Sequence, residues 1–344
     1  MTCSNDLQHL IDDILHHKSV SFVGMEKNTG KTEALNFVLR SLNKTSLRTA
    51  ITSIGLDGEK QDYIFSNAKP EITIYPKTTF VTAEKLYQCR QITSSIKNIS
   101  SQSTALGRLI TAQAMTKGRV IVAGPTNTAW LRQVIDALLC DNDLCLVDGA
   151  LSRLSLASPS ITDAMVLSTG AALSINMNMV VRKTDFILRM TQLETAEESL
   201  ASKLCNIKSG IYAIEDNNPV ALAIPSLLVI DKYKDVIFSH GKRLFIGGII
   251  TNNLLDFLLT QKDISSIELI IKDFTRIFSS IEQTDFFLRR GGKLKVITPT
   301  NLIAITINPI APNGFRFDAA KLQNALSERT NIPVYNVKDA LTTE

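Results

Sequence analysis

The sequence has few cysteines and histidines. Its five cysteines, at positions 3, 89, 140, 145 and 205, form no CxxC pair and have no histidine nearby. This spacing disfavours a thiolate metal site and indicates the reduced thiols of a cytoplasmic protein. Three of the four histidines lie within the first 17 residues, and no Ser-His-Asp or Cys-His combination stands out. Nucleophilic hydrolase chemistry is therefore disfavoured.

The sequence also lacks a strong charge excess and a long hydrophobic run. Lys and Arg number 37 against 33 Asp and Glu, and the net charge of +4 over 344 residues is too weak to indicate a nucleic-acid partner. No run approaches the roughly 18 apolar residues that a membrane span needs. The first residues, 1–18, form a short amphipathic pattern and not a secretion signal. We expect a cytoplasmic protein that binds neither nucleic acid nor membrane.

One nonapeptide near the N-terminus has the pattern of a phosphate-binding loop. GMEKNTGKT, from Gly24 to Thr32, follows the apolar run 20–23 and precedes a helical pattern over 33–42. A strand followed by such a loop and a helix directs backbone N–H groups and the positive helix end towards phosphates. The alternative is that Gly-Lys-Thr only forms a turn and a helix start.

Each residue type in this loop predicts a role. Lys31 would reach the β and γ phosphates, the Thr32 hydroxyl would ligate Mg²⁺, and Gly30 would let the backbone approach. The residues expected to complete the nucleotide site within the loop are Gly24, Asn28 and Thr29. Gly24 lies six positions before Gly30, so Met25 stands where the common motif has glycine. We therefore expect a longer or differently curved loop.

Acidic residues after two apolar runs are the candidates for metal and nucleotide contacts. Asp148 ends the run 144–147, as a carboxylate beside Mg²⁺ requires, although Asp-Gly also turns well by itself. Asp57 and Glu59 follow the second expected strand, and a solvated turn is the alternative there. The loop 123–128 lies between a strand and a helix, where a hydroxyl or an amide could face a ligand.

Strand-length apolar runs alternate with helical patterns, which predicts an α/β fold, here a P-loop NTPase with a mainly parallel sheet. We expect a nucleotide-binding domain over 1–190 and a second α/β region, suited to partner binding, over 191–344, divided at the polar stretch 191–203. In the first domain the pattern weakens over 55–104, where only 72–75 looks extended, and 105–123 fits either a hairpin that adds an antiparallel edge or a crossover. The expected strands lie near 19–24, 48–54, 119–123, 143–148, 164–169, 226–230, 244–250, 267–271, 294–297 and 302–307, and the expected helices near 31–42, 127–139 and 174–182.

Taken in order, several segments resemble a known family, the P-loop subunit of the reactivase of the cobalamin- and PLP-dependent lysine 5,6-aminomutase. The resemblance covers most of the chain and rests on GMEKNTGKT, TSIGLDGE from Thr52, AGP from Ala123, VDGA from Val147, SPSITDA from Ser158, LSTGAA from Leu167 and NPIAP from Asn308. It implies an ATP- and Mg²⁺-dependent ATPase in lysine fermentation, which acts with a larger MutS-like subunit to exchange damaged cobalamin from the aminomutase. The resemblance assigns no residue roles to the segments 158–172 and 308–318, which could contact the partner, the base or the aminomutase, or could be structural turns.

Two other functions fit the same loop. A small-molecule ligase or kinase of the dethiobiotin synthetase kind would need an acceptor pocket, to which Lys60 or Lys77 could contribute. A non-hydrolysing nucleotide sensor would keep Lys31 and Thr32 but would show no turnover.

Overall fold

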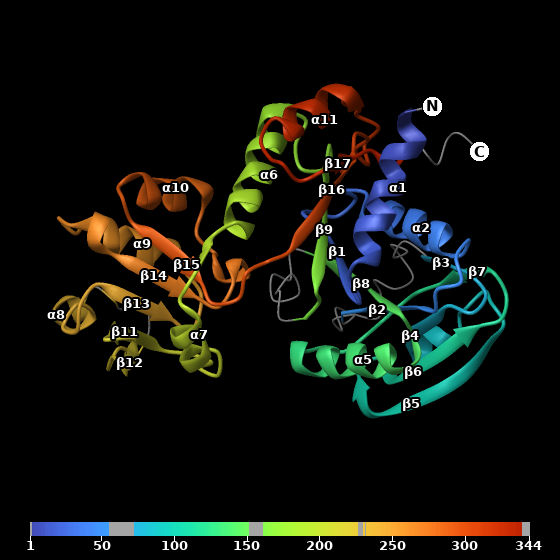
Figure 1. Ribbon diagram of the computed structural model, residues 1–344, viewed down its shortest axis with the longest axis horizontal. Helices are drawn as coiled ribbons and strands as arrows, with labels where there is room; N and C mark the ends of the chain where they lie inside the picture. Colours follow the sequence, from blue (N-terminus) through green and yellow to red (C-terminus); the bar gives the residue numbers. More distant parts are fainter. Residues whose placement is uncertain (1, 55–71, 151–160, 226–229, 231, 339–344) are drawn as a thin grey trace. The chain divides into compact units, whose positions relative to one another are not determined.

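The computed structural model describes residues 2–54, 72–150, 161–225, 230 and 232–338, which divide into two compact units (Figure 1). Unit 1 comprises Met1–Asp185 and Asn301–Glu344, and unit 2 comprises Phe186–Thr300. In the described ranges, no helix combines the length and the apolar character needed to cross a bilayer.

Unit 1 is built on a nine-stranded, mainly parallel sheet, which confirms the predicted α/β class. The strand order is β17-β16-β9-β1-β8-β2-β4-β6-β5, with parallel pairing from β17 to β4 and antiparallel pairing of β6 with β4 and β5. A separate antiparallel pair joins β3 and β7. The strands of unit 1 are β1 (Ser19–Gly24), β2 (Thr49–Ser53), β3 (Ile72–Ile74), β4 (Thr79–Ala83), β5 (Ser94–Thr104), β6 (Gly107–Ala114), β7 (Gly118–Val120), β8 (Leu144–Ala150), β9 (Ala164–Gly170), β16 (Leu302–Asn308) and β17 (Val334–Tyr335).

Helices cover both faces of this sheet. On one face, α1 (Thr2–Leu15) and α2 (Lys31–Leu42) share a buried cluster with Phe22 and Leu146. On the other, α5 (Thr128–Asp141) packs around Trp130 with Cys145 and other strand residues. The apolar stripe predicted for residues 31–42 is confirmed, because Leu35, Val38, Leu39 and Leu42 are buried. The remaining helices of this part of the chain are α4 (Glu84–Tyr87), α6 (Met177–Thr191), which runs across the division between the units, and α11 (Ala319–Ser327).

Unit 2 has its own six-stranded sheet in the order β10-β15-β14-β13-β11-β12, parallel from β10 to β13. Its strands β11 and β12 form an antiparallel hairpin beside β13. A buried cluster that includes Leu200, Phe245 and Ile270 joins α7 to the sheet. The elements are β10 (Glu194–Thr195), α7 (Glu198–Leu204), β11 (Ile211–Glu215), β12 (Asn218–Ala221), α8 (Lys234–Ile237), β13 (Arg243–Ile246), α9 (Asn252–Leu259), β14 (Glu268–Ile271), α10 (Ile281–Arg289) and β15 (Lys293–Val296).

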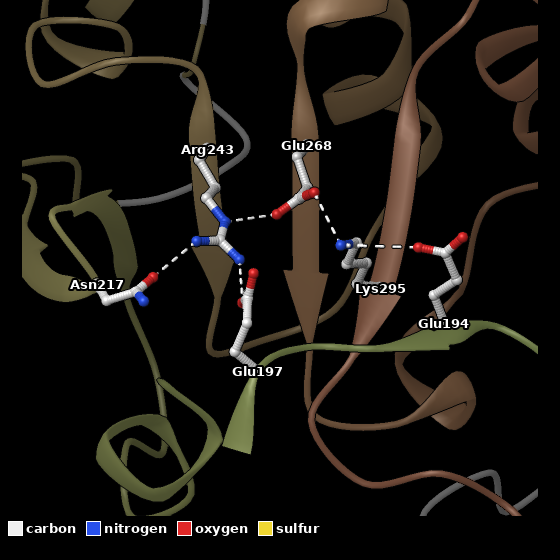
Figure 2. A network of polar contacts seen from close by, with 6 residues as sticks. All are labelled: Glu194, Glu197, Asn217, Arg243, Glu268 and Lys295. Atoms are coloured by element: carbon white, nitrogen blue, oxygen red, sulfur yellow. Dashed lines mark hydrogen bonds and ion pairs between the residues drawn. The ribbon is translucent and has the colours of Figure 1, made fainter. Parts of the chain in front are cut away.

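A charged network ties the strands of unit 2 to the segment before α7. Arg243 Nε lies 2.5 Å from Glu268 Oε1, and the same guanidinium contacts Glu197. Lys295 Nζ lies 3.4 Å from Glu268 Oε2 and 3.6 Å from a carboxylate oxygen of Glu194. A bond from its own backbone N–H, followed by the bond from Arg243, lowers the pKa of Glu197. Figure 2 shows this network with Glu194, Glu197, Asn217, Arg243, Glu268 and Lys295.

The boundary between Asp185 and Phe186 lies close to the expected one near residue 190, but the second unit does not extend to the C-terminus as expected. Residues 301–344 belong to unit 1, because β16 pairs in parallel with β9 of the first sheet. The expected strand 302–307 was therefore placed in the right residues but in the wrong half. A short apolar run carries no signal for which of two sheets it joins.

Within the described residues, the expectations for 72–123 differ most from the structure. An antiparallel edge exists, but β6 pairs with β5 and β4, whereas β7 pairs with β3 and ends at Val120. The structure also has β4 and β5 where the sequence predicted only 72–75. The helix expected at 174–182 spans 177–191. The strand expected at 226–230 lies almost entirely outside the described residues.

The network in unit 2 predicts a stability effect for Arg243→Met. We expect the free energy of unfolding to fall by about 1–3 kcal/mol, because Glu268, with a side chain 15% exposed, loses its guanidinium partner. The measurement is amide hydrogen exchange in β13, β14 and β15 at increasing urea concentration. Tryptophan fluorescence would not report on unit 2, because the single tryptophan lies in unit 1. Lys242→Met is the control, because its partner Asp263 is 76% exposed and the change should stay below about 0.5 kcal/mol. Equal losses in both variants would contradict the expectation.

Candidate phosphate-binding site

The loop Gly24–Thr32 connects β1 to α2 at the carboxyl edge of the parallel strands. All six residues of β1 are buried, and α2 begins at Lys31. Gly30 takes the N-cap position with φ of 91°, a left-handed conformation that strains residues with a Cβ. Since glycine offers no side-chain cap, the first N–H groups of α2 are left to an external acceptor. Such a helix end binds phosphate or another anion.

The unusual first half of the loop is fastened to β9 and α6. The backbone N–H of Met25 donates to the Ser168 carbonyl at 2.9 Å, and the Thr184 hydroxyl lies 3.5 Å from the Met25 sulfur. Thr29 is buried, and its hydroxyl donates to the Glu26 carbonyl at 2.9 Å. The Thr29 side chain therefore braces the loop, so its backbone N–H is the part left for phosphate.

Strand alternation brings Asp148 to the start of α2. In β8, Leu146 belongs to the cluster under α2, whereas Cys145 and Val147 face the α5 side. Successive strand residues point to opposite faces, so Asp148 lies on the α2 side. There its Oδ1 is 2.5 Å from Lys31 Nζ, and the two side chains are 4% and 20% exposed. The structure thus brings together Lys31 and Asp148, the two residues predicted to have catalytic roles.

Two further segments line the carboxyl edge next to Asp148. The Ser53 hydroxyl at the end of β2 donates to the Asp148 carbonyl at 3.0 Å. A Cβ on Gly124 would lie 1.6 Å from the Ser53 carbonyl oxygen, so only glycine permits this approach. In the loop 123–128, the Asn127 side chain caps α5 by accepting from the Trp130 N–H at 2.9 Å. Its amide oxygen is therefore committed to the helix.

Sequence reasoning missed Ser53 and Asn308 at this edge. Asn308 ends β16, and its side-chain amide donates to the Asn28 carbonyl at 3.0 Å. Their positions at the ends of parallel strands were the available signal. For Ser53, only the expected strand 48–54 was needed. For Asn308, the sheet to which β16 belongs had to be known.

The remaining predicted residues either lie outside the described residues or lie away from the site. Asp57, Glu59 and Lys60 lie outside the described residues, as do positions 158–160 of the segment 158–172. Lys77 is exposed and precedes Thr79, which starts β4 in register with Ala50 of β2. It therefore lies at the amino edge of the sheet, opposite the loop, and the acceptor role suggested for Lys77 is not supported.

The donor set fits a magnesium-bound polyphosphate. Backbone N–H groups at the start of α2 and the Lys31 ammonium suit phosphate oxygens, and the Thr32 hydroxyl and Asp148 carboxylate suit Mg²⁺. Thr32 lies half-buried in the first turn of α2. No protein-family model, curated protein or solved structure matches the chain.

The Lys31–Asp148 ion pair predicts energetic coupling in the ligand-free protein. Lys31→Met should lower the free energy of unfolding of unit 1 by about 2–4 kcal/mol, because a buried carboxylate loses its cation. The double variant Lys31→Met/Asp148→Asn should recover at least about 1 kcal/mol of that loss. Additive effects of the two single changes would contradict a coupled pair.

Unfolding of unit 1 has two local probes for this cycle. Trp130 is buried on the α5 side, so its fluorescence reports exposure. Burial raises the pKa of the Cys145 thiol to about 12, so the folded protein should resist alkylation there. The exposed Cys89 serves as the internal control for reagent activity.

Proposed function

We propose that this chain binds ATP with Mg²⁺ in the loop Gly24–Thr32 and hydrolyses it. The observation that carries the proposal is the ion pair between Lys31, at the first position of α2, and the buried Asp148 of the neighbouring strand. It unites a helix N-terminus, a cation and a carboxylate within one loop-strand junction. Phosphoryl transfer depends on positioning and charge neutralisation, which these groups supply.

The ion pair gives each residue a task in the reaction. Without nucleotide, Asp148 holds Lys31 and neutralises its charge. The β and γ phosphates offer the ammonium a second anionic partner, while backbone N–H groups of the loop fix the phosphate chain. Thr32 and Asp148 would hold Mg²⁺, which would neutralise charge on the phosphates. Because Lys31 and the metal share Asp148, nucleotide and Mg²⁺ should bind cooperatively.

The proposed biological role is that of the ATPase subunit of an aminomutase reactivase. This proposal is supported by the resemblance of several sequence segments that occur in the same order along the chain. In this role the chain acts with a larger MutS-like subunit to exchange damaged cobalamin from a lysine aminomutase. ATP would act by shifting a population, since bound phosphates hold loops in one arrangement and hydrolysis releases them. Chemistry on the cobalamin itself is not needed.

Mg²⁺-dependent ATP hydrolysis should require Lys31. Lys31→Arg keeps a cation beside Asp148, yet its planar fork cannot replace a point charge on the phosphates, so we expect turnover to fall at least about tenfold. Lys44→Arg, at the exposed far end of the same helix region, is the matched control and should change turnover less than about twofold. Phosphate release followed in a coupled assay is the measurement. Unchanged turnover in Lys31→Arg would reject the catalytic assignment.

Measurements of nucleotide binding and of turnover together separate the alternatives. In Asp148→Asn, calorimetry should show that Mg²⁺ strengthens ATP binding at least about tenfold less than in the parent, because the shared carboxylate is gone. Lys31-dependent nucleotide binding without turnover would instead favour the nucleotide sensor. Phosphate release that requires an added small-molecule acceptor would favour the ligase or kinase.

The reactivase role predicts recovery of a damaged enzyme. A lysine aminomutase loaded with inactive cobalamin should regain activity with this chain, its larger partner, ATP, Mg²⁺ and fresh adenosylcobalamin. Recovery should fail with Lys31→Arg and persist with Lys44→Arg. Absence of ATP-dependent recovery would reject this role and leave the ATPase proposal to its own test.

A further inference from the structure

Asn308 holds the phosphate-binding loop from two strands away. It ends β16, which lies beyond β9 from β1 in the sheet (Figure 1). The residue is 4% exposed, and both ends of its carboxamide make hydrogen bonds. Nδ2 donates to the Asn28 carbonyl at 3.0 Å, and Oδ1 accepts from the Ile310 N–H at 3.2 Å. These two bonds fix the direction of the amide.

The backbone around Asn308 is packed to the limit that glycine allows. A Cβ on Gly30 would lie 2.8 Å from the Asn308 Cβ, and a Cβ on Gly170 would lie 2.0 Å from the Asn308 carbonyl oxygen. That same carbonyl accepts from the Ala171 N–H at 2.9 Å. Asn308 therefore lies directly against the loop and the end of β9. A small displacement of Asn308 would displace Gly30 as well.

The hydrogen bond from Asn308 to the Asn28 carbonyl also determines the direction of the Thr29 N–H. A trans peptide unit is planar, and its C=O and N–H point in opposite directions. The bond from Asn308 consequently fixes the Thr29 N–H on the side away from Asn308. Asn28 is exposed and has φ of 63°, so its own packing does little to fix this peptide plane.

We propose that Asn308 is a positioning residue that presets the Thr29 N–H as a donor to the phosphates. This inference rests on the proposed nucleotide binding and deepens it. Asn308 need not touch the ligand, because it acts through the Asn28–Thr29 peptide group. Its role is to keep one N–H group in place before the anion arrives, which spares the cost of ordering the loop on binding.

The test compares Asn308→Ala with Asn301→Ala by calorimetry with ATP and with inorganic pyrophosphate. Asn308→Ala keeps the Cβ that contacts Gly30 and removes only the amide. Asn301, the exposed residue just before β16, also donates its side-chain amide to a backbone carbonyl, that of Asp163 at 3.2 Å, but lies at the opposite end of the strand from the loop. We expect Asn308→Ala to lower the affinity for ATP and for pyrophosphate by the same factor, at least about tenfold. Asn301→Ala should change either affinity less than about twofold.

A second readout separates positioning from general stability. Urea unfolding establishes that each variant is folded where binding is measured, and hydrogen exchange of the Thr29 amide should accelerate in Asn308→Ala but not in Asn301→Ala. Asn308→Asp, which replaces the donor with an acceptor, should show the same accelerated exchange and serves where the alanine variant fails to fold. Unchanged binding in a folded Asn308 variant overturns the inference while the nucleotide proposal stands. Absence of Lys31-dependent binding in the parent protein overturns both.

Discussion

The ion pair between Lys31 and Asp148 is the constraint on which the site depends. It requires α2 to begin at Lys31, β8 to lie next to β1, and Asp148 to point to the face that α2 covers. The first condition comes from Gly30, the second from parallel pairing, and the third from the two-residue period of the strand. A shift of one residue in β8 would turn Asp148 towards α5 and leave Lys31 without its carboxylate.

The stability of the fold does not account for this pair. Taking two charges out of water costs several kcal/mol, and well-packed apolar residues often stabilise a core as well as a buried ion pair does. What the pair provides is a cation and a carboxylate held ready at a helix N-terminus. In unit 2, by contrast, the charged network around Arg243 and Glu268 joins neighbouring strands to the segment before α7. Those charges hold elements of the fold together. We infer that the pair in unit 1 is kept for its chemistry.

Local signals in the sequence predicted the centre of the site, and non-local pairing decided the rest. Short apolar runs predicted β1 and β8, and the Gly30-Lys31 start with the apolar stripe that follows predicted α2. Each of these signals spans no more than about a dozen residues. The strand β5 was missed because its side chains are mostly exposed and polar, so no apolar alternation marks it. Asn308 was left without a role because its function comes from the pairing of β16 with β9, far away in sequence.

The loop is held on both flanks, and the two flanks differ in what a ligand can change. On the β9 and β16 side, Ser168 and Asn308 bind backbone groups of the loop, which a phosphate does not compete for. On the β8 side, Lys31 is held by the Asp148 carboxylate, and a bound phosphate would compete for that cation directly. Asp148 is hydrogen-bonded to Ser53, and Gly124 packs against the backbone of Ser53. A movement of Asp148 would therefore reach these two residues first. If nucleotide binds as proposed, it would act on the β8 flank, next to β2 and the start of α5, while the β9 flank keeps its contacts with the loop.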